Sequence, residues 1–270
     1  MKGIPHEDKG ILNPKYKVNV LGFNFLALQI LAGLIREKRI IEFTWGLYCL
    51  VRYQPKKISD YKIDLKHRDY SISIKLAIDK KTVICRSLSC NHLSKVYAEY
   101  GQPGARLIYI DANCVKIYDP YRDDLGVYHI HDIINIESDR YLVSTGDSSK
   151  YLDEFIINSR CCQRIKRHLK HLGGFTASIK TKETIFLGTD FSYRPNYILD
   201  YYSRKKYFLP KQAWLEYIIN INSKGKNILT IITKKLNHNV GHEVIFCILE
   251  KKFISAKKIS IIDKEIHATV

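Results

Sequence analysis

The sequence lacks the segments that would divide it into several domains. Its 270 residues include no low-complexity linker and no abrupt change of composition, and only one Met and two Trp. A chain of this length can bury a large core, and one all-β domain of this size is ordinary. The hydrophobic content of 46% excludes an intrinsically disordered protein. The sequence therefore indicates one folded domain over residues 40–270, preceded by an N-terminal arm and helix over residues 1–39.

The cysteine pattern of a secreted, disulfide-stabilised protein is also missing. There are seven cysteines, an odd number, their spacing is irregular, and no CxxC pair occurs. No apolar stretch closely follows the first charged residue, as it would in a signal peptide. We therefore expect a reduced, cytoplasmic protein.

The main apolar run, residues 21–35, is shorter than a membrane span. It is interrupted by Asn24 and Gln29, and about 20 apolar residues are needed to cross a bilayer. Its apolar residues recur at near-helical spacing, which predicts a helix over residues 22–37. A buried helix or core strand is the favoured interpretation, and an anchor on a membrane surface is the alternative.

Basic residues strongly outnumber acidic ones. The chain has 44 Lys and Arg against 27 Asp and Glu, a net charge of +17 and a pI of about 9.4. Such a field attracts nucleic acid, anionic lipid surfaces or acidic polysaccharides. The alternative is a lysine-rich surface that serves solubility alone.

Beyond residue 40 the sequence consists of short β-branched and aromatic stretches separated by turn residues. Residues 40–53 and 70–78 show this pattern, and the second stretch alternates between polar and apolar residues. Gly101-Gln-Pro-Gly104 and residues 119–126 are typical turn sequences. Further strands are expected over residues 81–86, 95–100, 106–110, 114–118, 126–130, 140–144, 154–158, 175–180, 184–188, 196–202, 206–209, 214–220, 227–233, 243–249 and 257–262.

Two of these stretches share a phrase. Tyr141–Asp147 and Thr184–Asp190 are apolar runs that pass into small residues and stop at aspartates 43 residues apart, and Arg106–Asp111 ends 36 residues upstream. A spacing near 40 residues is typical of a repeated sheet unit such as a propeller blade. A position 43 residues beyond Asp190 is Thr233, the last residue of a similar apolar run. This run ends in a threonine where the other two end in an aspartate. We interpret the phrases as inner strands of blades, each followed by a second strand and a more polar outer pair.

Ser144-Thr-Gly-Asp147 and Gly188-Thr-Asp-Phe-Ser-Tyr-Arg-Pro-Asn-Tyr-Ile198 resemble the inner-strand ends of five- or six-bladed propellers that act on or bind glycans. The resemblance extends over about residues 105–262, and no Asp-box is present. It implies an all-β protein, a β-propeller of five or six blades with a short N-terminal helical segment. Because propellers host many functions, the fold alone does not assign one.

Asp111, Asp147 and Asp190 are the candidate catalytic residues. Carboxylates from separate strands can divide acid and base roles, because burial and mutual repulsion separate their pKa values. Two such groups flank the scissile bond in glycoside hydrolysis. The alternative for each aspartate is a structural role, in which it accepts backbone N–H groups of a turn.

Arg194, Asn196 and Tyr197 are the candidate substrate-binding residues, since they closely follow Asp190. Arginine can hold a carboxylate or phosphate with two parallel hydrogen bonds. Asn and Tyr suit sugar hydroxyls through hydrogen bonding and ring stacking. The alternative is a structural loop whose turn is set by Pro195.

The strongest basic cluster, residues 160–171, contains the candidate polyanion-binding residues Arg164, Lys166 and Arg167. It lacks the interleaved aromatic residues of a platform for single-stranded nucleic acid. A solvated outer blade edge protected by charge is therefore the favoured interpretation.

No cofactor or metal site is expected. The histidine pairs have no third ligand at a suitable distance and are interpreted as ordinary histidines. These pairs are His129 and His131, His168 and His171, and His238 and His242.

These observations favour a glycan-directed propeller, and an enzyme of polysaccharide metabolism if the strand-end aspartates meet in one site. The alternative is a non-catalytic basic scaffold that binds nucleic acid or another polyanion.

Overall fold

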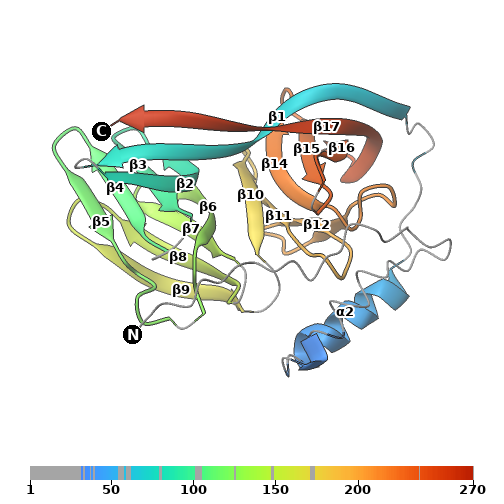
Figure 1. Cartoon of the computed structure of the whole chain (residues 1–270), viewed down its shortest axis with the longest axis horizontal. Coiled ribbons are helices and arrows are strands. Elements are labelled where there is room, and N and C mark those ends of the chain that lie inside the picture. Colours follow the sequence, from blue (N-terminus) through green and yellow to red (C-terminus); the bar gives the residue numbers. More distant parts are fainter. Residues whose placement is uncertain are drawn as a thin grey trace.

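The structure is a computed structural model dominated by β-strands, and the helix α2 (Ile40–Arg52) lies at its periphery (Figure 1). It describes residues 32, 34–36, 38, 40–53, 58, 62–78, 81–100, 105–124, 126–146, 149–170, 174–236 and 238–269.

The strands form four antiparallel blades of a β-propeller. The first blade is β2 (Lys81–Cys90), β3 (Ser94–Glu99), β4 (Leu107–Asp111) and β5 (Val115–Tyr118). The second is β6 (Ile130–Glu137), β7 (Arg140–Thr145), β8 (Tyr151–Ile157) and β9 (Cys162–Lys170). The third is β10 (Phe175–Lys180), β11 (Ile185–Thr189), β12 (Tyr197–Asp200) and β13 (Lys206–Phe208). The fourth is β14 (Tyr217–Ser223), β15 (Ile228–Lys234), β16 (Val240–Cys247) and β17 (Lys252–Thr269). The innermost strands contact one another in the order β2, β6, β10, β14.

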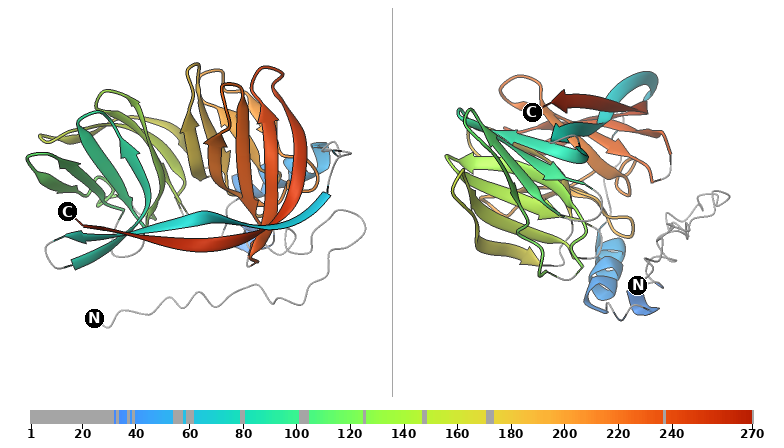
Figure 2. Two further views of the ribbon diagram at one scale, coloured as in Figure 1. Left: turned by 90° about the horizontal axis from the view of Figure 1, so that it is seen from above. Right: turned by 60° about the vertical axis from the view of Figure 1, so that its left-hand side comes forward.

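A parallel strand pair joins the first and fourth blades. Strand β1 (Lys62–Ile78) pairs along β17, from Lys62 opposite Lys257 to Ala77 opposite Thr269. At its end β1 also pairs with β2, so the two blades become one nine-stranded sheet. The β1–β17 ribbon runs past both halves of the molecule (Figure 2). The first and last strands of the described chain therefore close the ring.

Buried apolar clusters fill the spaces between neighbouring blades. One lies between the first and second blades and includes Val96 and Phe155. Another joins the second and third blades. A third, around Phe186, Ile218 and Phe246, joins the third and fourth blades. Because each blade buries apolar side chains against its neighbours, burial of this surface favours the assembled ring.

A buried residue at the end of the second strand fixes the start of the third strand in every blade. In three blades it is a fully buried threonine whose hydroxyl accepts a backbone N–H at 2.8, 2.9 or 3.0 Å: Thr145 from Tyr151, Thr189 from Tyr197 and Thr233 from His242. In the first blade the carboxylate of Glu99 accepts the N–H of Arg106 at 3.3 Å. A buried N–H without a partner is costly, so this position requires a compact acceptor. The three threonines are 44 residues apart, and they are the physical basis of the repeat near 40 residues.

The predicted propeller is confirmed, with two differences in its details. The described strands form four blades, β2–β5, β6–β9, β10–β13 and β14–β17, where the sequence suggested five or six. The phrases at Tyr141 and Thr184 lie in second strands, β7 and β11, and the inner strands β6 and β10 precede them. Similarly, Arg106–Asp111 lies in a third strand, β4. The polar start of β6 concealed an inner strand from sequence reading.

Residues 40–52 form the helix α2 instead of the expected strand. Tyr53, which follows it, packs its ring 4.3 Å from that of Phe208, and its hydroxyl donates to the carbonyl of Leu209 at 3.1 Å. Gly46 and Cys49 are buried on the same side of the helix as these contacts. Tertiary packing here outweighs the strand propensity of β-branched and aromatic residues.

The predicted helix over residues 22–37 lies mostly outside the described residues, although Ala32 and residues 34–36 are helical. Over the ranges given above, no helix combines the length and the apolar character that crossing a membrane requires.

Candidate functional site

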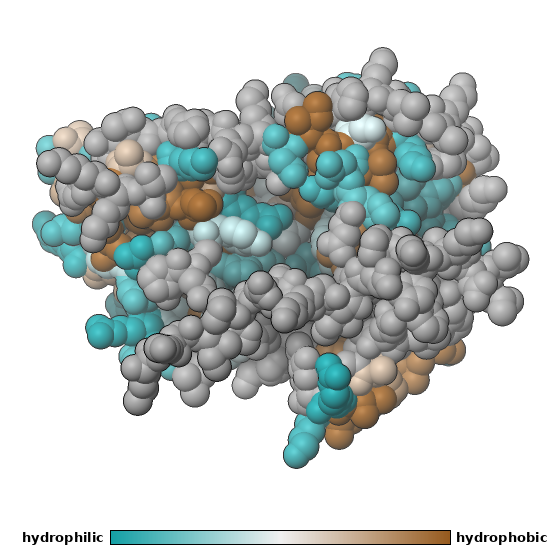
Figure 3. All heavy atoms as spheres, viewed as in Figure 1, coloured by the Kyte–Doolittle hydropathy of each residue, from teal (hydrophilic) through white to brown (hydrophobic). Residues whose placement is uncertain are grey.

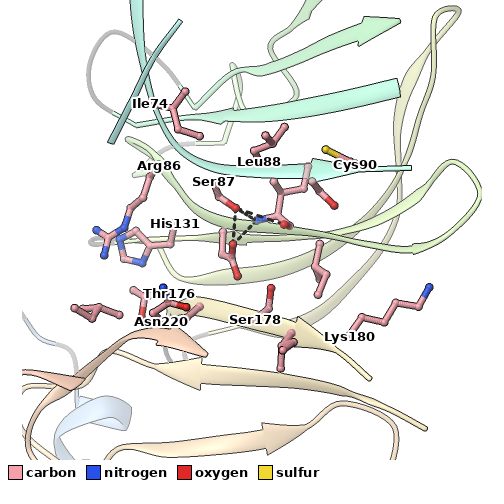
Figure 4. Close-up of a pocket in the computed structure, with 17 residues that line it drawn as sticks. Ile74, Arg86, Ser87, Leu88, Cys90, His131, Thr176, Ser178, Lys180 and Asn220 are labelled. Carbon is pink, nitrogen blue, oxygen red and sulfur yellow. Dashed lines mark hydrogen bonds between the residues drawn. The ribbon is translucent and has the colours of Figure 1, made fainter. Parts of the chain in front are cut away.

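A cleft of about 510 Å³ lies where the four innermost strands meet. Each strand contributes a polar side chain to its lining: Ser87 from β2, Asp132 from β6, Ser178 from β10 and Asn220 from β14. Figure 4 shows Ser87, Ser178 and Asn220 around a common space, with Thr176 beside Asn220. A concave site with a few polar groups that converge on it is a candidate binding site.

Asp132 is the carboxylate of this cleft. Its Oδ1 accepts the hydroxyl of Ser87 at 2.5 Å and the backbone N–H of Ile133 at 2.9 Å. Its Oδ2 is buried and has no hydrogen-bond partner within the described part of the chain. Burial raises the pKa of Asp132, while the hydroxyls of Ser178 and Ser87 and the Ile133 N–H oppose that rise. One carboxylate oxygen is thus fixed and the other is left to accept a hydrogen bond from a ligand.

Two buried histidines lie at one end of the cleft. His131 lines the cleft, and its Nε2 is 2.9 Å from Nε2 of His129, so one of the two nitrogens donates to the other. Nδ1 of His131 lies 3.5 Å from Oδ2 of Asp190, whose Oδ1 accepts Lys150 Nζ at 3.0 Å. Burial, together with the positive charges of Arg86, His129 and Lys150, lowers the pKa of His131 well below its usual range. His131 is therefore neutral at physiological pH.

Two glycines provide the space for the His131 ring. A Cβ atom on Gly146 would lie 1.8 Å from Nε2 of His131. One on Gly174 would lie 2.9 Å from Nδ1 of His131 and 3.1 Å from Oδ1 of Asp190. The imidazole can occupy its position only because both neighbours lack side chains. Over the described ranges, no three His, Cys, Asp or Glu side chains lie together as a metal site would require.

Comparison with known proteins assigns neither a family nor a function to this chain. No protein-family model matches the sequence, and no curated protein matches it. Similar solved structures include hydrazine synthase from Kuenenia stuttgartiensis, with 11% identity, a TM-score of 0.49, and coverage of 65% of this chain and 49% of that one. The WD40 domain of coronin from Toxoplasma gondii has 9% identity, a TM-score of 0.46, and coverage of 75% and 53%. YCF48 bound to a D1 peptide has 10% identity, a TM-score of 0.44, and coverage of 67% and 55%. The chain spans about half the length of each of these three, and at such low identity no functional argument rests on them.

The three candidate catalytic aspartates have different surroundings. Asp190 lies behind His131 at the end of the cleft, and Asp147 lies outside the described residues. Asp111 is the last residue of β4, and its Oδ1 accepts the N–H groups of Asn113 and Cys114 in the turn that follows, both at 2.8 Å. The corresponding turns of the second and third blades use Asn158 and Asp200 in the same way.

The candidate substrate-binding residues Arg194, Asn196 and Tyr197 are all buried. The Asn196 amide is bonded to both the N–H and the carbonyl of Phe191, at 2.6 and 2.7 Å. The Arg194 guanidinium lies 3.4 Å from the centre of the Phe191 ring. In this structure the three residues fix the chain that follows β11.

The candidate polyanion-binding residues lie on β9, the outermost strand of the second blade. Arg167 forms a salt bridge of 2.7 Å with Asp153, and Arg164 pairs with Asp124. Lys166 is exposed. The two arginines are therefore largely neutralised by neighbouring aspartates.

Sequence reasoning missed the residues that line the cleft. The expected strands ended at residues 86 and 130, just before Ser87 and Asp132. His129 and His131 were interpreted as ordinary histidines. The available signal was His129-Ile-His-Asp132, a polar phrase at the start of a strand that an apolar run, Ile133-Ile134, continues.

We predict that the cost of Gly146→Ala depends on His131. The added methyl collides with the imidazole, so this substitution should lower the free energy of unfolding by about 1–3 kcal/mol. In a His131→Ala background the same methyl meets no ring and its cost should approach zero. Denaturant titration of the four proteins of this double-mutant cycle measures the difference. An equal cost in both backgrounds would contradict the described position of His131.

We also predict that acid destabilises the protein through His131. The folded protein keeps this imidazole neutral, whereas the unfolded chain binds a proton below about pH 6.5. Stability should therefore fall between pH 7 and 5, by up to about 1.4 kcal/mol per pH unit from this group. His131→Asn should reduce the slope, whereas His92→Asn, at an exposed histidine, should not. Identical slopes for both variants would show that His131 is not the group responsible.

Proposed function

We propose that the protein binds a polyhydroxylated ligand, a sugar unit of a glycan, in its central cleft. The observation that carries this proposal is Asp132, which lines the cleft: its Oδ1 is held by Ser87 and Ile133, and its buried Oδ2 has no hydrogen-bond partner among the described residues. Charge-assisted hydrogen bonds from hydroxyl to carboxylate are short and strong.

Other polar side chains of the lining fit the same ligand class. The Thr176 hydroxyl donates to the carbonyl of Ile218, so its oxygen can accept a hydrogen bond from a ligand. Ser178 supplies a second hydroxyl, and the Asn220 amide can donate and accept through separate atoms. Sugar hydroxyls also donate and accept, so each can be matched by one of these groups. A volume of about 510 Å³ is within the usual range for small-ligand sites.

Binding is better supported than hydrolysis. Glycoside hydrolysis uses two carboxyl groups on either side of the scissile bond. Among the described residues that line the cleft, Asp132 is the one carboxylate, and Asp190 is held by Lys150 behind His131. The sequence predicts catalytic roles for Asp111, Asp147 and Asp190, and these roles stay a prediction. Asp→Asn variants at the three positions test it once a substrate is identified.

We predict that Asp132→Asn weakens glycan binding at least about tenfold, because it replaces a charge-assisted acceptor by a neutral amide. The wild-type protein is screened on an oligosaccharide array, and the best ligand is titrated by calorimetry. Asp111→Asn is the matched control, since it makes the same change at a carboxylate outside the cleft. An unchanged melting temperature establishes that each variant is folded.

Two results would contradict the proposal. One is an array on which the wild-type protein binds no glycan. The other is an affinity that Asp132→Asn and Asp111→Asn leave equally unchanged.

Nucleic acid or another polyanion is the second candidate ligand, and the fourth blade favours it. This blade exposes Lys224, Lys226, Lys251 and Lys257, whereas the arginines of β9 are paired with aspartates. Binding there would weaken steeply with salt because counterions are released. A neutral sugar in the cleft would be insensitive to salt, so salt dependence separates the two candidates.

A further inference from the structure

The helix α2 is apolar on both of its faces, and the propeller covers only one of them. On the covered side Gly46 and Cys49 are buried, and Phe43 belongs to a cluster with Leu34 and Trp214. A helix that is apolar all round is normally enclosed. The second face therefore requires a covering that the described residues do not supply.

The uncovered face carries an apolar stripe that is interrupted by the exposed Thr44. Its apolar side chains lie in the first turn and in the last two turns of the helix and are between 38% and 75% exposed: Ile40, Ile41, Leu47, Tyr48 and Val51. The ring of Tyr48 stacks on that of Trp45, with centroids 5.5 Å apart, so the stripe is anchored to the packed side of the helix. Figure 3 shows this patch along α2, with hydrophilic atoms at one end.

Positive charges lie at both ends of the stripe. Arg36 and Lys38 are exposed before the helix begins, and Arg52 is exposed in its last turn. The whole chain carries a net charge of +17. A second copy placed on this face would bring like charges together, whereas an anionic surface would attract them.

We infer that α2 lies on an anionic membrane surface, with Ile40, Ile41, Leu47, Tyr48 and Val51 in the boundary between headgroups and acyl chains. An apolar face with flanking Lys and Arg is the general design of helices that lie in this interface. Tyrosine suits it because the ring is apolar and the hydroxyl stays hydrated. The helix has 13 residues, which is too short to cross a bilayer. The apolar residues 21–35, immediately upstream in the sequence, extend the same character.

Vesicle flotation of the full chain tests this inference. Vesicles of phosphatidylcholine alone are compared with vesicles in which about a third of the lipid is phosphatidylserine. The protein should float with the anionic vesicles and be released from them by salt. The double variant Ile41→Asp/Val51→Asp should partition at least about tenfold more weakly, because it places charges in the apolar boundary.

The control is Ile117→Asp/Leu249→Asp, which makes the same charge change at exposed apolar residues on β5 and in the β16–β17 turn. It should keep wild-type binding apart from a small effect of net charge. All four positions are exposed, so the variants should fold, and the milder Val51→Ser gives a second test at the helix.

Three outcomes would overturn the inference. The wild-type protein could fail to float with anionic vesicles at low salt, or the two double variants could lose binding equally. Alternatively, light scattering could show a dimer that only the helix variant dissociates, in which case a second copy covers α2.

Discussion

Strands β1 and β17 pair in parallel along most of their length, and this pairing holds the first blade against the fourth. Every other contact between blades joins neighbours in the sequence, across the borders of β2 with β6, β6 with β10 and β10 with β14. These local contacts alone would leave an open arc of blades. Closure joins residues nearly two hundred positions apart, so the hydrogen bonds of β1 and β17 must offset a large loop-closure entropy. The central cleft exists only while its four inner strands face one another, and it therefore depends on this closure.

The structure separates what repeats from what does not. Thr145, Thr189 and Thr233 occupy the same place in three blades and accept the same backbone N–H, with Glu99 as their counterpart in the first blade. A hydrogen bond that recurs at the same place in each blade serves the folding of the blade. The cleft residues Ser87, Asp132, Ser178 and Asn220 come from equivalent strands but supply two hydroxyls, a carboxylate and an amide. We interpret the first set as structural and the second as the source of ligand specificity.

The period and fold class could be predicted from the sequence because a threonine at the end of the second strand recurs at a fixed spacing in three of the four blades. The rank of each strand within a blade could not. The sequences that end at Asp190 and at Asp111 look alike. Asp190 follows β11, the second strand of its blade, whereas Asp111 caps the turn after β4, the third strand of its blade.

Secondary structure was also predicted wrongly for residues 40–52. Their composition is typical of a strand, but they form the helix α2, which packs on the third blade. The cleft was missed because its residues are single polar groups in separate strands, which only the closed ring brings together. His131 adds a further requirement, since its position depends on the absence of side chains at Gly146 and Gly174.

Native-state hydrogen exchange, followed residue by residue under increasing denaturant, tests the role of closure most directly. If β1 and β17 hold the ring together, their paired amides should exchange only in the same cooperative unfolding that exposes β6 and β10. Exchange of β1 and β17 at a clearly lower free energy, with β6 and β10 still protected, would show that the ring and its cleft persist without this closure.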